Sequence, residues 1–160
     1  LFVMAGYLIK RRGSRDINAY GGVDKVAPVL AGLLLFAGLS TLSLPGLSSF
    51  VSEFMVLAGT FGRHPGYAVI STLAIVLTTL YILIMYQHTM TGPTTPEVKE
   101  KVTELNGRER LAMAPLVLLI LVLGVFPKPM LAIIEPATQA TLLHVGVPDP
   151  QPRVTAEGGR

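Results

Sequence analysis

The sequence contains no cysteine. The chain therefore has no disulfide, no thiolate metal site and no cysteine-ligated iron–sulfur cluster of its own. Signatures of soluble enzymes are missing as well: a zinc-binding HExxH pair, a phosphate-binding glycine loop followed by Lys-Ser or Lys-Thr, and a GxSxG nucleophile turn. The glycines at positions 6, 13, 21 and 22 do not form a dinucleotide fingerprint. We expect no residue of this chain to bind a metal, NADH, a flavin or haem.

Charge is also scarce, since 14% of the residues are charged and 51% are hydrophobic. Long runs at 26–47, 67–86 and 111–126 carry no charged side chain. A soluble domain of 160 residues could bury one such helix but not three, so the sequence predicts an all-α membrane protein embedded in a lipid bilayer. The net charge of +3 is small, and no basic stripe with interleaved aromatic residues is present, which excludes a nucleic-acid partner.

Hydropathy predicts that residues 1–146 form a membrane domain, a bundle of transmembrane helices. The first segment is about 14 Å long, half a bilayer core, and we expect it to be the end of a helix whose start is missing. A short interfacial helix interrupted at Pro136 is expected over 130–145, and 147–160, rich in proline, glycine and charge, is expected to be disordered. The membrane segments are 1–9, 27–62 interrupted at 44–49, 66–90, and 108–126 with Asn106 as its N-cap.

The 27–62 segment is predicted to be one broken helix with halves 27–43 and 50–62. As a single straight helix it would be about 54 Å long, well beyond the ~30 Å hydrocarbon core. Two crossings joined at Pro45-Gly46 are possible, but 50–62 is short for a span. Non-helical backbone at membrane depth is tolerated only where it is buried in protein or lines a watery cavity. Hydroxyls that could satisfy freed carbonyls or hold water surround the break: Ser40, Thr41, Ser43, Ser48, Ser49 and Ser52. The alternative is a proline kink whose serines bond back to the helix.

Basic residues in the loops predict the orientation. Five of them lie in the 10–25 loop, which is therefore expected on the cytoplasmic side. If 27–62 crosses once, the 92–110 stretch, with Lys99, Lys101, Arg108 and Arg110, is also cytoplasmic; two crossings would put it outside. The charge rule favours the single broken helix and places the C-terminal tail on the outer side.

Glu53 is the one ionisable side chain placed deep inside a hydrophobic segment. A carboxylate within a membrane is costly and is interpreted as functional by default. We expect it in the first turn or so of the second half-helix, where burial disfavours its charged form and a helix N-terminus favours it. A proton site is the first hypothesis, and a static ion pair that joins two helices is the alternative.

The three histidines and the hydroxyls of 66–90 give weaker signals. His88, at the cytoplasmic end of 66–90, suits a proton entry point, although a residue at headgroup level is the simpler interpretation. His64, in a short outer loop, and His144, in the tail, are expected to be solvated. The remaining polar side chains of that segment line a polar path or make contacts between helices: Thr78, Thr79 and Tyr81.

The run LSLPGLSSFVSEFMVLAGTF at 42–61 closely resembles the broken helix of the antiporter-like subunits of respiratory complex I, best of all their M or chain 4 type. Flanking features agree: Arg15-Asp16 followed by Gly21-Gly22, Ser71-Thr72, and GVFPKP at 124–129. The resemblance covers nearly all of 1–145. It implies a C-terminal fragment of an antiporter-like fold of about fourteen helices, of which this chain holds the last four.

In that family the residue at Glu53 is the terminal group of a proton pathway. M types carry Glu there, whereas L and N types and the related cation/proton antiporter subunits generally carry Lys. The expected upstream Lys and Glu partners lie on helices that this sequence does not contain. Two positions depart from the family pattern, with Ser52 where glycine is common and His88 where a more basic residue is frequent.

The resemblance implies a proton-translocating membrane-arm subunit of NADH-quinone oxidoreductase, a translocase that couples quinone reduction to proton pumping and has no redox centre in this chain. NADH, FMN, iron–sulfur clusters and quinone would belong to other subunits, and neighbouring antiporter-like subunits would be partners. The expected location is the inner (plasma) membrane of a bacterium, crossed several times. The rivals are a subunit of a multi-subunit monovalent cation/proton antiporter, a hydrogenase membrane arm, and a structural membrane subunit in which Glu53 only pairs helices.

Overall fold

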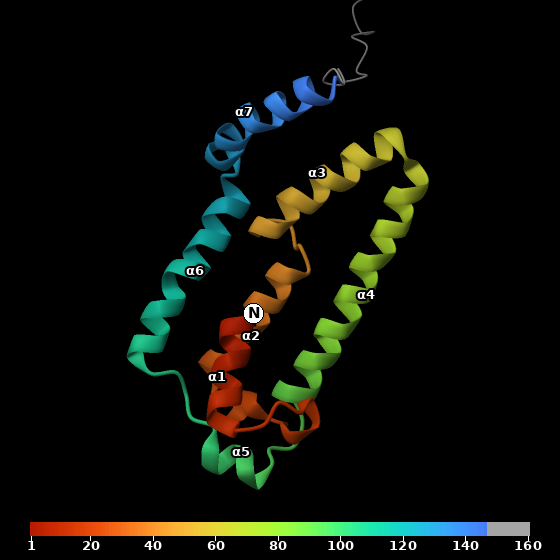
Figure 1. Ribbon diagram of the computed structural model, residues 1–160. Helices are drawn as coiled ribbons and strands as arrows, with labels where there is room; N and C mark the ends of the chain where they lie inside the picture. Colours follow the sequence, from red (N-terminus) through yellow and green to blue (C-terminus); the bar gives the residue numbers. More distant parts are fainter. Residues whose placement is uncertain (147–160) are drawn as a thin grey trace, which may run out of the picture. The chain divides into compact units, whose positions relative to one another are not determined.

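The structure, a computed structural model, describes residues 1–146, and no strand occurs in that range. The chain divides into two units, Leu1–Val125 and Phe126–Arg160. Figure 1 shows the course of the helices. The first unit contains six α-helices and two short 3₁₀ turns, and the second contains α7. In chain order the elements are α1 (Phe2–Arg12), η1 (Ile17–Ala19), η2 (Val23–Lys25), α2 (Pro28–Thr41), α3 (Ser48–Arg63), α4 (Pro65–Met90), α5 (Pro96–Lys101), α6 (Gly107–Val125) and α7 (Lys128–Val145).

Helix α1 runs three residues beyond the predicted end at residue 9. Its last turn consists of Lys10, Arg11 and Arg12, and it ends at Gly13, whose left-handed φ of 75° is typical of a C-terminal cap. Cations are favourable at a helix C-terminus. Both arginines are also paired with acids distant in the sequence, Arg11 with Glu109 on α6 and Arg12 with Glu97 on α5, so the basic cluster extends the helix and does not end it.

The break in the 27–62 segment lies two residues earlier than the predicted 44–49. Helix α2 ends at Thr41 and α3 begins at Ser48, which leaves 42–47 as the helix break. Pro28 at the first position of α2 suits a helix start because its missing N–H would have no partner there. The predicted break residues Ser48 and Ser49 therefore belong to the first turn of α3.

Helices α3 and α4 pack against each other as a hairpin joined through His64. Pro65 stands at the start of α4 for the same reason as Pro28 in α2. By length and composition α4 is the one helix among residues 1–146 that could cross a membrane by itself, and α6 with α7 pass only when taken together. The number of crossings therefore stays a prediction.

One end of the first unit carries what we call the loop layer, the segments 13–27 and 91–106, which include α5. The two segments are joined by hydrogen bonds from Gly22 N–H to Thr91 O (3.0 Å), from Thr94 Oγ1 to Gly22 O (3.1 Å) and from Lys25 Nζ to Gly92 O (2.9 Å). Both basic loops thus lie at the same end, as the single broken helix requires. The main buried cluster lies against the loop layer: Met4, Leu8, Tyr20, Val23, Ala27, Leu30, Ala31, Leu34, Met90, Val98, Val102, Leu105 and Met113.

Away from the loop layer the helices expose large apolar side chains. Leu77 and Ile70 on α4 are about two-thirds exposed, and Leu118 on α6 is 61% exposed. A continuous exposed apolar face of this kind is typical of a surface that meets lipid or other protein. These exposed apolar faces are poorly suited to contact with water.

Proline interrupts neither of the last two helices. Asn106 precedes α6 as predicted, and Glu109 accepts a hydrogen bond from the Asn106 N–H at 2.9 Å, which is half of a capping box. The expected interruption at Pro136 is wrong, because α7 continues from Lys128 to Val145. Proline removes one backbone donor, and here the Thr138 hydroxyl donates to the Ile134 carbonyl across that turn (3.2 Å). The predicted disordered tail, 147–160, lies outside the described residues.

Candidate functional site

The helix break is a tight turn with an unusual residue on its α2 side. The Leu47 N–H donates to the Leu44 carbonyl at 3.0 Å, with Pro45 and Gly46 between them and a φ of 93° at Gly46. Proline followed by a left-handed glycine is the pattern of a type II turn. Ser43 also has a positive φ, 54°, and its hydroxyl is buried with no hydrogen-bond partner among residues 1–146. A positive φ is uncommon at residues other than glycine, and residues in such strained backbone conformations cluster at functional sites.

Two of the hydroxyls near the break are bonded to their own helices. Thr41 Oγ1 donates to the Ala37 carbonyl at 2.9 Å, and Ser52 Oγ donates to the Ser49 carbonyl at 2.9 Å. Such bonds to the helix's own carbonyls are what the alternative interpretation of the break, a proline kink whose serines bond back to the helix, predicts. Ser43 differs from Thr41 and Ser52, because its hydroxyl is buried and has no hydrogen-bond partner among residues 1–146.

Glu53 lies in the second turn of α3, because the helix begins at Ser48. The expected position is the first turn or so of the second half-helix; Glu53 is the sixth residue of α3, just beyond the first turn, where the helix N-terminus mainly acts. Glu53 is half-buried. The ion pairs among residues 1–146 are Arg11–Glu109 and Arg12–Glu97, and neither includes Glu53.

Glu53 lines a pocket of about 320 Å³ between the end of α2, α3 and α4, which we call the Glu53 pocket. Helical spacing explains its walls, since residues three, four and seven apart share a face. One wall comes from α3, with Glu53, Val56 and Leu57. The other comes from α4, with Ser71, Ala74, Ile75 and Thr78, and Thr41 and Leu42 close the end. A single carboxylate thus shares an otherwise apolar pocket with three hydroxyl groups.

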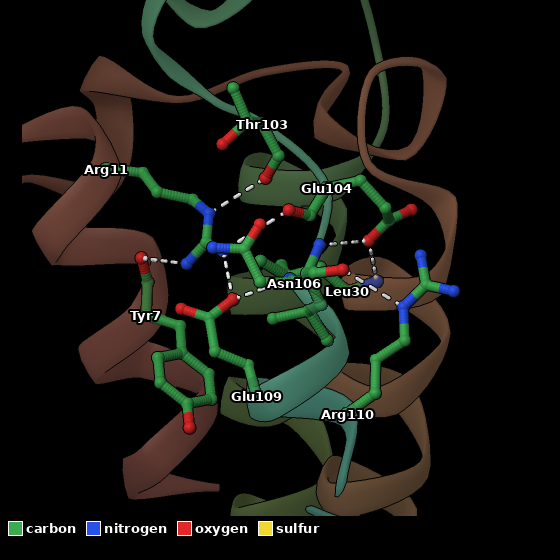
Figure 2. A network of polar contacts seen from close by, with 9 residues as sticks. Tyr7, Arg11, Leu30, Thr103, Glu104, Asn106, Glu109 and Arg110 are labelled. Carbon is green, nitrogen blue, oxygen red and sulfur yellow. Dashed lines mark hydrogen bonds and ion pairs between the residues drawn. The ribbon is translucent and has the colours of Figure 1, made fainter.

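A second set of polar residues, around Arg11, ties α1 to the loop layer (Figure 2). Arg11 Nε donates to the Thr103 carbonyl at 2.8 Å, and its terminal nitrogens donate to the Tyr7 and Glu104 carbonyls at 3.3 Å and to the Glu109 carboxylate. Arg12 pairs with Glu97 on α5. A guanidinium presents several donors in one plane, which suits this divided role.

Glu104 caps the N-terminus of α2. Its carboxylate accepts hydrogen bonds from the N–H groups of Val29 (2.8 Å), Leu30 (3.1 Å) and Leu105 (2.9 Å). Burial raises the pKa of this carboxyl, but these three bonds and the nearby Arg110 outweigh burial and hold the pKa below its ordinary value. The first half of the broken helix is therefore fixed by a charge from the 91–106 segment.

Residues 1–80 match the family described as NADH:quinone oxidoreductase/Mrp antiporter, TM. The chain belongs to this family. It is 51% identical over 154 residues to NADH-quinone oxidoreductase subunit M of Mycobacterium tuberculosis, which covers 96% of this chain and 28% of that protein. It is 36% identical over 133 residues to subunit M of Pseudomonas aeruginosa, 83% of this chain and 26% of that protein.

The likeness extends to a relative from a plant. NADH-ubiquinone oxidoreductase chain 4 of Arabidopsis thaliana is 32% identical over 144 residues, 90% of this chain and 29% of that protein. The chain thus spans a little more than a quarter of the length of these relatives. Residues 1–146 contain no strand, the chain is a member of a membrane antiporter-like family, and the resemblance to subunit M is confirmed.

Within this antiporter-family chain, the structure does not bring His88 to the Glu53 pocket. His88 is exposed in the last turn of α4, ten residues beyond Thr78, which is about 15 Å along a helix. His64 joins α3 to α4 and packs against the Tyr67 ring in a tilted arrangement, and His144 lies in the last turn of α7. Tyr81 is 58% exposed, and Thr79 bonds to the Ile75 carbonyl at 2.9 Å. Thr78 is the only one of the expected α4 hydroxyls that lines the pocket.

Two parts of the polar network had a signal in the sequence. Thr95-Pro96 before α5 is a typical start of a helix, and the Thr95 hydroxyl accepts from the Val98 N–H at 3.4 Å. Asn106 and Glu109 have the spacing of a capping box. No pattern in the sequence indicated the pairings that Arg11 and Glu104 make. Among residues 1–146, no three His, Asp or Glu side chains gather in a way that would hold a metal.

Proposed function

We propose that this chain forms part of a proton-translocating membrane subunit of a bacterial NADH-quinone oxidoreductase. The likeness to subunit M of other bacteria and the membership of the antiporter family support the assignment. NADH, FMN, iron–sulfur clusters and quinone would act in other subunits, and the chain's part in the translocase is to move protons. It lies in the plasma membrane beside other membrane-arm subunits, with the loop layer on the cytoplasmic side and the C-terminus outside.

Within that subunit, we propose that Glu53 exchanges protons as the terminal carboxylate of the pathway. The observation that carries this is its place in the Glu53 pocket, half-buried and joined to no cation among residues 1–146. A pocket of about 320 Å³ has room for several water molecules. Water held between a carboxylate and the hydroxyls of Thr41, Ser71 and Thr78 gives a proton a route that apolar side chains alone do not give.

The helix break serves this route by opening the backbone next to the pocket. Thr41 and Leu42 end α2 and also line the pocket. Helix α3 restarts at Ser48, so Glu53 stands about one turn and a half beyond the start of α3, which directly follows the turn at Pro45-Gly46. Irregular backbone at membrane depth is tolerated where it lines a watery cavity. The helix break and the Glu53 pocket thus belong to the same proposed proton route.

The test is Glu53→Gln in the assembled complex, reconstituted into vesicles. Glutamine keeps the size of the side chain but cannot release a proton, so we expect proton pumping per NADH oxidised to fall at least about tenfold. Electron transfer from NADH to quinone with an uncoupler present should persist. Glu100→Gln, an exposed acid on α5, is the matched control and should pump normally. A wild-type pumping ratio in Glu53→Gln would overturn the proposal.

Two rivals predict different results from the same variant. The family description also covers Mrp antiporters, and such a subunit would support sodium–proton exchange in vesicles without NADH. If Glu53 only joined helices, Glu53→Gln would reduce the amount of assembled complex and leave the pumping ratio of what remains intact. Measuring assembly, pumping and cation exchange on one preparation separates the three.

A further inference from the structure

Helix α6 meets the helix break through a pair of glycines. A Cβ built on Gly124 would overlap the carbonyl oxygen of Gly46 and would lie 2.6 Å from the carbonyl carbons of Gly46 and Leu47. Real Cβ atoms do not approach backbone atoms so closely. Only glycine at 124 lets α6 lie against this turn, and only glycine at 46 readily takes the left-handed φ of 93° that the turn requires. Figure 1 shows α6 passing beside the start of α3.

The contact is exceptional among the helical glycines of the described chain. A Cβ on Gly32 in α2 or on Gly59 in α3 would meet nothing within 4 Å, and one on Gly38 would meet a flexible Ile82 methyl at 3.2 Å. At Gly124 the obstacle is backbone, which cannot rotate away as a side chain can. Close approach of this kind, with a glycine hydrogen facing a carbonyl, recurs at helix–helix interfaces.

We propose that Gly124 is a positioning residue for Glu53, and that α6 holds the start of α3 in place through it. Helix α3 has α6 against one part of its surface and α4 against another, with the Glu53 pocket toward α4. Gly46 is two residues before Ser48, where α3 begins. A side chain at 124 therefore displaces the turn and the start of α3 away from α6. This displacement moves Glu53 and narrows the pocket. The proposal deepens the proposed function and rests on it wherever proton pumping is the readout.

The absence of cysteine in this chain provides a readout that does not depend on pumping. Ser71 lines the pocket from α4, so Ser71→Cys places one thiol there. Its rate of reaction with a small charged methanethiosulfonate reagent, followed on this subunit in the whole complex as the labelling in excess of the same complex without Ser71→Cys, reports access to the pocket. In the Ser71→Cys background we expect Gly124→Ala to slow labelling severalfold and Gly124→Val to slow it further. Gly32→Ala is the matched control and should leave the rate unchanged.

Pumping is measured on the same glycine variants without the cysteine. We expect Gly124→Ala to lower the number of protons pumped per NADH while assembly and uncoupled electron transfer stay near normal. Unchanged labelling and pumping in Gly124→Ala would overturn this proposal, and so would equal effects in Gly32→Ala. Slower labelling with normal pumping, found together with normal pumping in Glu53→Gln, would confirm the geometry and reject the proton role of Glu53. If Gly124→Val fails to assemble, Gly124→Ala alone decides.

Discussion

The loop layer and the helix break differ in whether their charged side chains have partners. In and beside the loop layer, Arg11 contacts Glu109 and three carbonyls, and Glu104 accepts three backbone N–H bonds. Near the helix break, Glu53 has no cation partner among residues 1–146, and the Ser43 hydroxyl is buried without a partner. Paired charges stabilise a fixed geometry, whereas an unpaired carboxylate beside water can change its protonation. The contrast separates a structural polar network from a candidate chemical one.

Breaking the loop layer should give the largest effect on stability. Arg11→Ala leaves the Glu109 carboxylate without its cation, and the two side chains are only 8% and 18% exposed. We expect Arg11→Ala to lower the free energy of unfolding more than the other variants of this region, because it also removes the hydrogen bonds to the Thr103, Tyr7 and Glu104 carbonyls. Thermal unfolding of the detergent-solubilised protein measures it. Arg15→Ala, an exposed arginine of the same loop, should change the stability by less than about 0.5 kcal/mol.

The same variant tests the separation of the two regions. If Arg11→Ala complexes that survive solubilisation pump protons with the wild-type ratio, the loop layer is structural. A pumping defect as large as that of Glu53→Gln, at equal amounts of assembled complex, would show that the two regions are one system and the contrast is false.

Much of the helix break was predictable from the sequence, and little of the loop layer was. Pro45, Gly46 and Glu53 signal the break locally, because proline, glycine and a lone acid in apolar sequence each restrict structure on their own. The loop layer depends on pairs such as Arg11–Glu109, 98 positions apart, whose partners carry no mutual pattern. Hydropathy also treats Lys10, Arg11 and Arg12 as loop, although ion pairs keep the last two in a helix.

The Gly124–Gly46 contact escaped sequence reasoning for a related reason. A glycine inside an apolar helix has several meanings, and its role depends on which backbone lies opposite. Ser48 and Ser49 fall inside the interruption predicted at 44–49, yet both form the first turn of α3. The local preferences of proline and glycine located the helix break to within two residues. The residues at which α2 ends and α3 begins depend also on how the helices pack.

The next smaller effect concerns the cap that fixes α2. Glu104→Gln keeps the shape of the side chain but loses its charge at a helix N-terminus, which we expect to cost about 1 kcal/mol at pH 7. The pKa of Glu104 is lowered on folding. Its contribution is therefore complete above the unfolded pKa of about 4.3 and is lost as the pH falls through the lower folded value. The difference between wild type and Glu104→Gln should thus shrink below about pH 4.3.

Unfolding curves taken from pH 7 downwards measure this difference. Glu100→Gln, an exposed acid on α5, should follow wild type at every pH. A gap between wild type and Glu104→Gln that stays constant or widens on acidification would show that the charge of Glu104 does not hold α2.

The smallest expected effect distinguishes two adjacent hydroxyls on α4. Thr78 and Thr79 both donate to the carbonyl four residues before them, at 2.8 and 2.9 Å, but only Thr78 lines the Glu53 pocket. Valine keeps the side-chain volume and removes one hydroxyl, so each variant loses the same bond to its own helix. If water in the pocket uses the Thr78 hydroxyl, its loss costs about 0.5–1 kcal/mol, or about two- to fivefold in the rate of proton transfer. Pumping rates of Thr78→Val and Thr79→Val in matched vesicles compare them. Slowing confined to Thr78→Val supports a route through the pocket, whereas equal slowing in both would mean that the hydroxyls stabilise α4 and that the route lies elsewhere.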